Sequence, residues 1–356
     1  MKIALITDQH FGARNDSVLF LDFYEEFYSK TFFPTLKEED IKTVLILGDT
    51  FDRRKYVNFN TLQRAKTMFF DRLREEDIAV YMLAGNHDTY YKNTNDVNSV
   101  DLLLKEYENI LVIDKPMTIH LNYHNDTDDI LMIPWICADN YDRCLEEIKN
   151  TSVKLCAGHF EISGFSMYRG HPCQEGLNRE MFRKFEYTFS GHYHHKSTSD
   201  GIHYLGNPYE LTWQDYHDDR GFHVFDLDTR DLIFYKNPNV MFHRVIYDDS
   251  DTSQTQTDFS RLKDRYVKVV VVSKTNPYQF DRFMDSIYSS EPADVKIVED
   301  FSELTEGLDE DIINEAEDTL TILNKYIDGI GETNIDNSKL KNILRELYIE
   351  AVNTDT

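Results

Sequence analysis

The stretch Gly85-Asn86-His87-Asp88 decides how the rest of the chain is interpreted. It follows the apolar run Val80–Ala84, which is typical of a buried strand, and the glycine permits a tight turn where that strand ends. An amide, an imidazole and a carboxylate then occupy consecutive positions, a set suited to chemistry and poorly suited to packing in a core. We therefore expect a functional site at the end of this strand.

Four other predicted strands end in residues of the same kinds. Open α/β sheets build their sites at the carboxyl ends of strands, so these residues should converge. A lone histidine at a strand end is more often structural, but five such ends in one chain favour a shared site. The strands are Ile3–Thr7, Val44–Leu47, Val153–Ala157 and Tyr187–Ser190, and the residues that follow them are Asp8, His10, Asp49, His159, His192 and His194.

The first 245 residues alternate strand-like and helical runs, which indicates an α/β fold. We expect one domain over 1–245, with two facing mixed β-sheets flanked by helices. Predicted helices include Val18–Phe33, with an end near Pro34, and Phe59–Leu73. The second, more antiparallel sheet is predicted to contain Ile202–Leu205, Phe222–Asp226 and Leu232–Tyr235.

Two smaller regions follow a polar segment at Asp248–Asp258, which is interpreted as a linker. A small α+β capping domain is predicted at 259–300, with strands Tyr266–Val272 and Val295–Val298 around a helix at Tyr278–Tyr288. Residues 305–356 carry two amphipathic patterns, which predict a helix-loop-helix. These helices either dock on a partner or pack on each other and on their own domain. The residues assigned to partner binding are Leu320, Leu323, Ile327, Leu340, Ile343, Leu344 and Leu347.

The composition limits the classes of protein that fit. No apolar run approaches the ~18 residues that a membrane span needs, and the four cysteines show no CxxC pairing, so we expect reduced thiols in a cytoplasm. The net charge of −26 is unusual for a nucleic-acid binder. Residues 291–356 hold 18 acidic and 5 basic residues, so half of the excess lies in this last segment. The acidity argues against strong DNA binding without metal, but it is compatible with a metal-dependent nuclease.

The residues at the strand ends are metal ligands by type. Imidazoles together with carboxylates suit borderline cations such as Mn²⁺, Fe²⁺ and Zn²⁺. The set exceeds the needs of one ion, and Asp49 could bridge two ions about 3.5–4 Å apart. The ligands in Asp8-Gln9-His10 and in His192-Tyr193-His194 are two positions apart, so each pair would point the same way on an extended backbone.

Together these motifs resemble the calcineurin-like metallophosphoesterase superfamily. Within it, the chain is most similar to the SbcD-type DNA repair nuclease family and, among these, to bacteriophage members, which would place it in a bacterial host cytoplasm. The motifs are Asp8-x-His10, Gly48-Asp49-x-Phe51-Asp52, Gly85-Asn86-His87-Asp88, Gly158-His159 and Gly191-His192-x-His194. Further segments that carry the resemblance are Asp52–Lys55, Ile133–Ile136, Gly158–Glu161, Gly206–Pro208 and Asp219–Phe222.

The resemblance implies a role for each motif residue. His87 would act as the acid toward the leaving 3′-oxygen, and Asp88 would orient it. Many cellular members carry a histidine where this chain has Asp52, so the role of that histidine in exonuclease action does not transfer. Asp52 could have a structural role, such as an ion pair with Arg53 or Arg54, or a catalytic one. The cofactor implied is two Mn²⁺, with Mg²⁺ as an alternative. The first ion would be held by Asp8, His10, Asp49 and His194, and the second by Asp49, Asn86, His159 and His192.

The activity implied by the resemblance is that of a DNA nuclease. It would trim duplex ends 3′→5′, cut single strands endonucleolytically, and act as a homodimer within a heterotetramer with an SMC-like coiled-coil ATPase. From the residues themselves, DNA contacts are predicted at Arg53, Arg54 and Lys55, with surface ion pairs as the alternative. Tyr90, Tyr91 and Lys92, after the Asn-His-Asp motif, are weaker candidates that could stack on or wedge a DNA end.

Two other functions remain open at this point. The same metal scaffold could belong to a phosphoprotein phosphatase or a cyclic-nucleotide phosphodiesterase. Alternatively, the chain could be a non-catalytic scaffold that recruits the ATPase to DNA ends, although every expected ligand position is filled.

Overall fold

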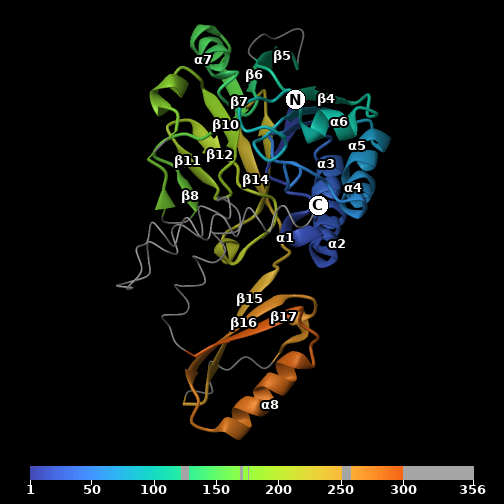
Figure 1. Cartoon of the computed structure of the whole chain (residues 1–356), viewed down its shortest axis with the longest axis vertical. Helices are drawn as coiled ribbons and strands as arrows, with labels where there is room; N and C mark the ends of the chain where they lie inside the picture. The colour runs from blue at the N-terminus through green and yellow to red at the C-terminus, as the bar shows by residue number, and fades with distance from the viewer. Residues whose placement is uncertain (122–127, 169–170, 175, 251–257, 300–356) are drawn as a thin grey trace, which may run out of the picture. The chain divides into compact units, whose positions relative to one another are not determined.

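The structure is a computed structural model whose described residues are 1–121, 128–168, 171–174, 176–250 and 258–299. The described residues fall into two compact units (Figure 1). The larger unit holds 1–243 with 258–267 and 283–295, and the smaller holds 244–250, 268–282 and 296–299. All strand-end residues predicted to form the site belong to the larger unit.

The first large sheet contains three of the strands that lead to the site. Its strand order is β14-β13-β1-β2-β3-β4. The central strands β1, β2 and β3 and the edge strand β4 run parallel, whereas β13 is antiparallel to β1. The bounds are β1 Lys2–Ile6, β2 Thr43–Ile46, β3 Ala79–Leu83, β4 Ile110–Ile113, β13 Gly221–Asp226 and β14 Leu232–Lys236.

The second large sheet supplies the other two strands. Its order is β11-β12-β10-β7-β6-β5, and β7 runs parallel to both β6 and β10. The bounds are β5 Met117–Ile119, β6 Ile130–Ile133, β7 Leu155–His159, β10 Tyr187–Gly191, β11 Ser197–Ser199 and β12 Ile202–Tyr204. A small two-stranded sheet pairs β8 Ser166–Tyr168 with β9 His171–Pro172.

The predicted fold class is therefore confirmed, but the membership of the second sheet was wrong. Of the three late strands expected to lie together, only β12 is in the second sheet, where it pairs parallel with β10. The other two, β13 and β14, extend the first sheet beyond β1. Alternating apolar residues show that a strand has a buried face, but they do not show which neighbour it pairs with.

Alternation along β1 explains how both faces of the first sheet are covered. Ile3 and Leu5 share an apolar cluster with Phe189 of the second sheet, so this cluster is the core between the two sheets. Ala4 and Ile6 point to the opposite face and pack in a larger, aromatic-rich cluster with helical residues. Each of the central strands is buried on both faces, as is usual for parallel sheets.

The helices cover the outer faces of the sheets. The first runs through α2 Val18–Phe27, the π-helical segment η1 Tyr28–Phe32 and α3 Phe33–Glu38, so it does not end near Pro34 as predicted. Pro34 lies in the first turn of α3, where a missing N–H costs least. The remaining helical segments are α1 Ala13–Asp16, α4 Phe59–Ala65, η2 Lys66–Phe70, α5 Asp71–Glu75, α6 Ser99–Leu104, α7 Tyr141–Asn150, η4 Arg179–Phe182, η5 Trp213–Asp215 and η7 Ser260–Leu262.

A three-stranded sheet with the order β15-β16-β17 follows the large domain. Its elements are β15 Phe242–Asp248, β16 Tyr266–Ser273, α8 Pro277–Tyr288 and β17 Asp294–Val298. The predicted strand–helix–strand order is present, and β15 adds a strand that was not assigned to it. The predicted helix-loop-helix at 305–356 lies outside the described residues, as does most of the predicted linker.

Two compositional expectations can be compared with the structure. Cys137, Cys144, Cys156 and Cys173 all carry free thiols. Among the described residues, no helix has both the length and the apolar character needed to cross a membrane.

Candidate metal centre

The residues predicted as ligands lie at or just beyond the ends of β1, β2, β3, β7 and β10, and several have unusual backbone conformations. Asp8, His10, Asp49 and His192 all have positive φ angles, of 52°, 44°, 51° and 84°. Such angles are uncommon outside glycine and cluster at functional sites. The turns after these strands are therefore strained at the positions that carry the chemistry.

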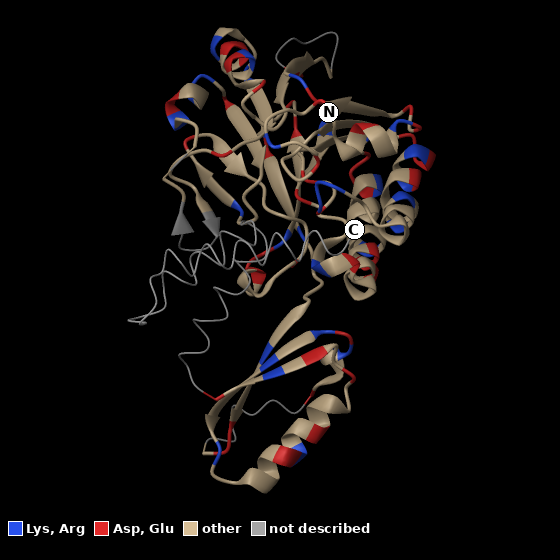
Figure 2. Cartoon of the chain, in the orientation of Figure 1, with Lys and Arg blue, Asp and Glu red and all other residues tan. Residues whose placement is uncertain are grey.

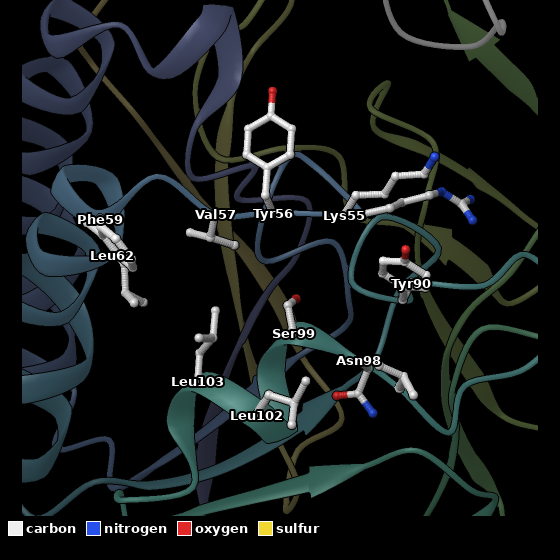
Figure 3. Close-up of a pocket in the computed structure, with 12 residues that line it drawn as sticks. Lys55, Tyr56, Val57, Phe59, Leu62, Tyr90, Asn98, Ser99, Leu102 and Leu103 are labelled. Atoms are coloured by element: carbon white, nitrogen blue, oxygen red, sulfur yellow. The ribbon is translucent and has the colours of Figure 1, made fainter. Parts of the chain in front are cut away.

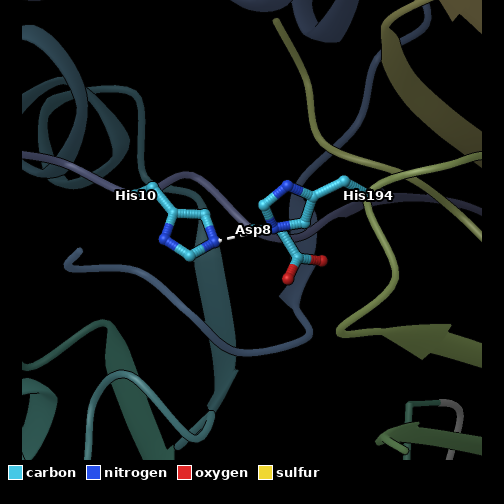
Figure 4. Close-up of side chains that lie close together, drawn as sticks. All are labelled: Asp8, His10 and His194. Carbon is cyan, nitrogen blue, oxygen red and sulfur yellow. Dashed lines mark hydrogen bonds between the residues drawn. The ribbon is translucent and has the colours of Figure 1, made fainter. Parts of the chain in front are cut away.

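The first group of ligand atoms comes from Asp8, His10 and His194 (Figure 4). Their donor atoms lie within 4.8 Å of one another, and the Nε2 atoms of the two histidines are 3.0 Å apart. Asp8 is held in place by the Thr7 hydroxyl, which donates to it at 2.8 Å, and by the backbone N–H of His192 at 3.1 Å. All donor atoms of this group therefore converge on one point.

The second group comes from Asp49, His159 and His192. The His159 Nε2 atom is 3.3 Å from the Asp49 carboxylate. The side-chain oxygen of Asn86 lies 2.9 Å from His159 Nε2 and 3.0 Å from His192 Nδ1, so the amide joins this group. His159 is oriented by its Nδ1–H, which donates to the Leu47 carbonyl at 2.7 Å.

Asp49 lies between the two groups. The same oxygen that faces His159 is 3.9 Å from His10 Nε2 of the first group. Its other oxygen accepts the backbone N–H of His87 at 2.8 Å. The carboxylate expected to bridge two ions is thus adjacent to both sets of ligands.

One detail of the sequence prediction was wrong. His192 and His194 were expected to point the same way on an extended backbone, but His192 joins the second group and His194 the first. The left-handed conformation of His192 turns the chain and separates the two side chains. This division matches the one that the family resemblance implied.

Glycines let the strand ends approach one another closely. A Cβ atom at Gly85 would collide with the backbone and carboxylate of Asp49, and one at Gly191 would collide with Thr7. Gly48 has a φ of +99°, and a Cβ there would lie 2.5 Å from the His159 ring. The glycines beside the ligand motifs are therefore required by packing within the site.

His87 lies beside the first group, with its ring 4.8 Å from that of His10. Its Nδ1–H donates to the backbone carbonyl of Asp52 at 2.6 Å. This bond fixes the orientation of the ring and does not involve the second ring nitrogen, Nε2. The orienting partner is thus the Asp52 carbonyl, and Asp88 has a different role from the one expected. The Asp88 carboxylate is fully buried and accepts backbone N–H groups of Thr50, Phe51 and Gly85.

Asp52 also differs from expectation. Its carboxylate faces His10 Nδ1 at 3.4 Å, and no ion pair joins it to Arg53 or Arg54, the structural alternative named for it, among the described residues. His10, Asp52 and His87 form a third group of potential ligands that shares His10 with the first. Burial alone would raise the pKa of Asp52, but the hydrogen bond to His10 and its charge lower it.

Buried carboxylates dominate the electrostatics of the site. Burial opposes a charge on His10, but the hydrogen bond to Asp52 and the charge of Asp49 raise the pKa of His10 to about 10. Burial likewise opposes a charge on His159, whereas Asp49 raises its pKa to about 9. Burial and the charge of His159 lower the pKa of His192 to about 3. The site therefore favours positive charge close to Asp49.

The pKa values of the carboxyl groups follow from the same charges. Burial would raise the pKa of Asp49, but His159 and His87 hold it well below its usual range. Burial raises the pKa of Asp88 to about 6, and the Asp49 charge acts in the same direction. Burial also raises the pKa of Asp8. For His194, burial and the charge of His10 keep the pKa well below normal.

The residues present fit a dinuclear metal site. Two groups of nitrogen and oxygen donors converge separately, and one carboxylate lies between them. The mixture of imidazole, carboxylate and amide suits borderline divalent cations. Asp8, His10, Asp49 and His194 could hold one ion, and Asp49, Asn86, His159 and His192 the other.

Supporting residues that the sequence prediction missed surround the ligands. The Arg220 guanidinium donates to the His194 carbonyl and pairs with Asp215 at 2.7 Å. The Trp135 ring lies 5.0 Å from the His192 ring. Both residues lie in segments that carry the family resemblance, Ile133–Ile136 and Asp219–Phe222, but no local pattern marked either as a support of the ligands.

The residues predicted to contact DNA lie in different environments. Arg53 is held by Asp16 at 3.1 Å and by Asn15 at 2.6 Å, which is the ion-pair alternative. Lys55 and Lys92 are exposed, and Tyr91 is half-exposed with its ring against Tyr90. Arg54 is partly buried and lines a neighbouring pocket.

The fold and the two ligand groups define the chain as a metallophosphoesterase. Residues 1–196 match the calcineurin-like phosphoesterase family. The chain is also 31% identical over 354 residues to exonuclease subunit 1 of Enterobacteria phage T4, and the match covers 99% of each chain. The chain therefore belongs to the calcineurin-like phosphoesterase family, as its motifs predicted, and this family uses divalent metals.

Solved structures of low similarity were also found. An archaeal phosphodiesterase is 11% identical with a TM-score of 0.33, covering 67% of this chain and 100% of its own. The purple acid phosphatase PPD1 from yellow lupin is 11% identical with a TM-score of 0.38, covering 66% of this chain and 52% of its own.

Proposed function

We propose that this chain is a metal-dependent DNA nuclease, with 3′→5′ exonuclease activity on duplex ends and endonuclease activity on single strands. The observation that carries the proposal is the match over nearly the full length to a phage protein named as an exonuclease subunit. The two converging ligand groups support hydrolytic chemistry at a phosphodiester. Double-strand-break processing, recombination and replication are the processes in which such an activity would serve.

Two Mn²⁺ are the proposed cofactors, with Mg²⁺ as an alternative. When bound, the ions would supply Lewis-acid chemistry for phosphodiester hydrolysis. The imidazole ligands favour Mn²⁺ over Mg²⁺, which prefers oxygen donors. The protein's own contribution is a preorganised ligand set, because Asp8, Asp49 and His159 are each fixed by further hydrogen bonds.

His87 is the proposed general acid. With Nδ1–H bonded to the Asp52 carbonyl, the Nε2 nitrogen is the atom able to give a proton to the leaving 3′-oxygen. The bond to a backbone carbonyl holds the ring in one tautomer. Asp88 supports this indirectly, since it fixes the turns at Gly85 and Thr50 that carry the ligands.

An SMC-like coiled-coil ATPase is the proposed partner, and the name of the phage relative as a subunit supports a complex. Helix α5 carries Asp71 and Glu75 beside Arg72 and Arg74, and Arg64 of α4 pairs with Asp22 and Glu25. Figure 2 shows acidic and basic residues mixed over this group of helices, so they offer no continuous basic stripe for DNA. A partner would then supply much of the positive DNA-binding surface. The partner-binding residues proposed from the sequence lie in 305–356.

A homodimer within a heterotetramer is proposed as the assembly. Phe59 is 88% exposed and Leu102 is 66% exposed, and both line one apolar pocket. A two-fold interface uses the same patch on both copies. A patch with both a protruding phenylalanine and an apolar hollow can be complementary to itself.

Cleavage of defined substrates tests the activity. The protein should degrade an end-labelled duplex and a single-stranded circle in Mn²⁺, and it should leave a phosphopeptide intact. Asp49→Asn should abolish cleavage. His87→Ala should reduce turnover by at least about 100-fold while metal binding persists. Hydrolysis of the phosphopeptide without DNA cleavage would favour a phosphatase. Full nuclease activity in His87→Ala would indicate a contaminating nuclease in the preparation and would favour the scaffold hypothesis.

A further inference from the structure

Three consecutive basic residues, Arg53, Arg54 and Lys55, follow the Asp49 motif, and the structure separates their roles. The Arg53 guanidinium donates three hydrogen bonds, to Asp16, Asn15 and the Tyr56 hydroxyl. Lys55 is exposed to solvent. Arg53 therefore makes the contacts of a structural residue, and we do not assign it to DNA binding.

Arg54 differs from both neighbours. It is partly buried, and its Nη1 nitrogen is out of reach of solvent without a hydrogen-bond acceptor in the described residues. A buried charged donor that lacks an acceptor is costly, so such a group suits a ligand that supplies one. The acceptor that an arginine fork binds best is a carboxylate or a phosphate.

The position of Arg54 indicates which phosphate it could reach. It follows Asp52 by two residues, and Asp52 contacts the site through its carboxylate, 3.4 Å from His10 Nδ1, and through its carbonyl, 2.6 Å from His87 Nδ1. However, Arg54 lines a pocket of about 180 Å³ whose lining includes none of the proposed metal ligands. Arg54 is thus adjacent to the metal centre and opens onto the surface beside it.

The pocket has two chemically different ends (Figure 3). Phe59 and Leu62 lie at one end, and Lys55 and Tyr90 lie at the other. Tyr90 is 42% exposed. The end with Lys55 and Tyr90 combines a cation with an aromatic ring, the pattern that proteins use along a nucleic-acid strand.

We infer that Arg54 binds a phosphate of the substrate strand next to the one being hydrolysed, and so makes the enzyme selective for polynucleotides over simple phosphodiesters. This inference rests on the proposed function. Arg54 would act in substrate binding, while the metal ligands and His87 act on the scissile phosphate. A substrate with a single phosphate would leave Arg54 without its ligand.

The test compares two substrates in Mn²⁺, a single-stranded oligonucleotide and bis-p-nitrophenyl phosphate, which has one phosphodiester only. Arg54→Ala should raise KM for the oligonucleotide about tenfold and leave hydrolysis of bis-p-nitrophenyl phosphate unchanged. The log–log dependence of oligonucleotide binding on salt should become shallower by about 0.7, the slope for one contact on a single strand. Arg54→Lys should keep most of the salt slope, because it retains the charge.

A matched control is Arg74→Ala, which removes an exposed arginine that pairs with Asp71 on α5. It should behave as the wild type with both substrates. If Arg54→Ala also matches the wild type on the oligonucleotide, the inference is overturned. It is equally overturned if activity on both substrates falls together, since Arg54 would then act at the metal centre or in folding. A wild type that hydrolyses bis-p-nitrophenyl phosphate but no DNA would instead refute the proposed function.

Discussion

At the scale of single residues, Asp88 shows how a motif residue can serve the site without touching substrate. Its buried carboxylate accepts three backbone N–H groups from two separate turns, at Thr50, Phe51 and Gly85. Those turns carry Asp49 and Asn86. A residue adjacent to His87 in sequence thus acts on the framework of the site.

Asp88→Ala should lower the free energy of unfolding by about 3 kcal/mol, because three buried N–H groups lose their acceptor. Asp88→Asn should lower it less, because the amide oxygen still accepts. Urea unfolding at neutral pH measures both. His87→Ala, a partly exposed neighbour that loses a single hydrogen bond, is the control and should lower stability by about 1 kcal/mol. An Asp88→Ala variant as stable as that control would refute the framework role.

Glu210 gives a pH dependence that does not involve the metal centre. Its carboxylate accepts the backbone N–H groups of Met241 and Phe242 at 2.6 and 2.9 Å. Burial raises the pKa of Glu210 to about 7 from its ordinary 4.5, against the effect of these hydrogen bonds. The folded state therefore holds an extra proton between these two values, and stability falls as pH rises through the window.

Glu210→Gln removes this pH dependence, since the amide is uncharged and its oxygen can still accept both bonds. The variant should match the wild type below pH 4.5 and be more stable by up to about 3 kcal/mol above pH 7. Thermal unfolding of both proteins from about pH 4 to about pH 8 checks this. A stability difference that is constant across the range would contradict the assigned pKa shift.

At the scale of elements, the strands that carry the ligands were predictable because each is a short apolar run followed by a polar turn. The directions of the side chains were not predictable, because Asp8, His10 and His192 have positive φ and period-2 alternation fails there. The sheet to which each strand belongs could not be predicted either, because β13 pairs with β1, which precedes it by more than 200 residues. Similarly, Pro34 stays within a helical segment because the preceding turn is π-helical.

Helix α4 supplies a prediction about assembly. Phe59, at its first position, is 88% exposed and lines the same pocket as the exposed Leu102, and an apolar patch of this kind suits a partner. Phe59→Glu should convert the proposed dimer to a monomer, as measured by light scattering after size exclusion. Tyr278→Glu, which changes another exposed aromatic residue on α8, is the control. A wild type that is already monomeric at micromolar concentration would contradict the proposed dimer.

At the scale of the whole molecule, we propose that the chain divides its tasks along its length. All of the proposed metal ligands lie among the described residues of 1–243. Half of the acidic excess lies in 291–356. A catalytic domain with an acidic carboxyl-terminal region fits a subunit whose DNA-binding surface is supplied by another protein.

Removal of residues 305–356 tests this division. The truncated chain should lose co-purification with the ATPase and keep Mn²⁺-dependent hydrolysis of bis-p-nitrophenyl phosphate, because every proposed ligand remains. Retained activity is also the control for folding. Undiminished binding to the ATPase would show that the partner contacts another part of the chain.

The central claim is that strands distant in sequence bring together two cation sites that share Asp49. A crystal structure of the protein grown with Mn²⁺, with anomalous scattering recorded at the manganese edge, measures this directly. We expect two peaks about 3.5–4 Å apart, on either side of the Asp49 carboxylate. A single peak, or two peaks that do not share Asp49, would contradict the account.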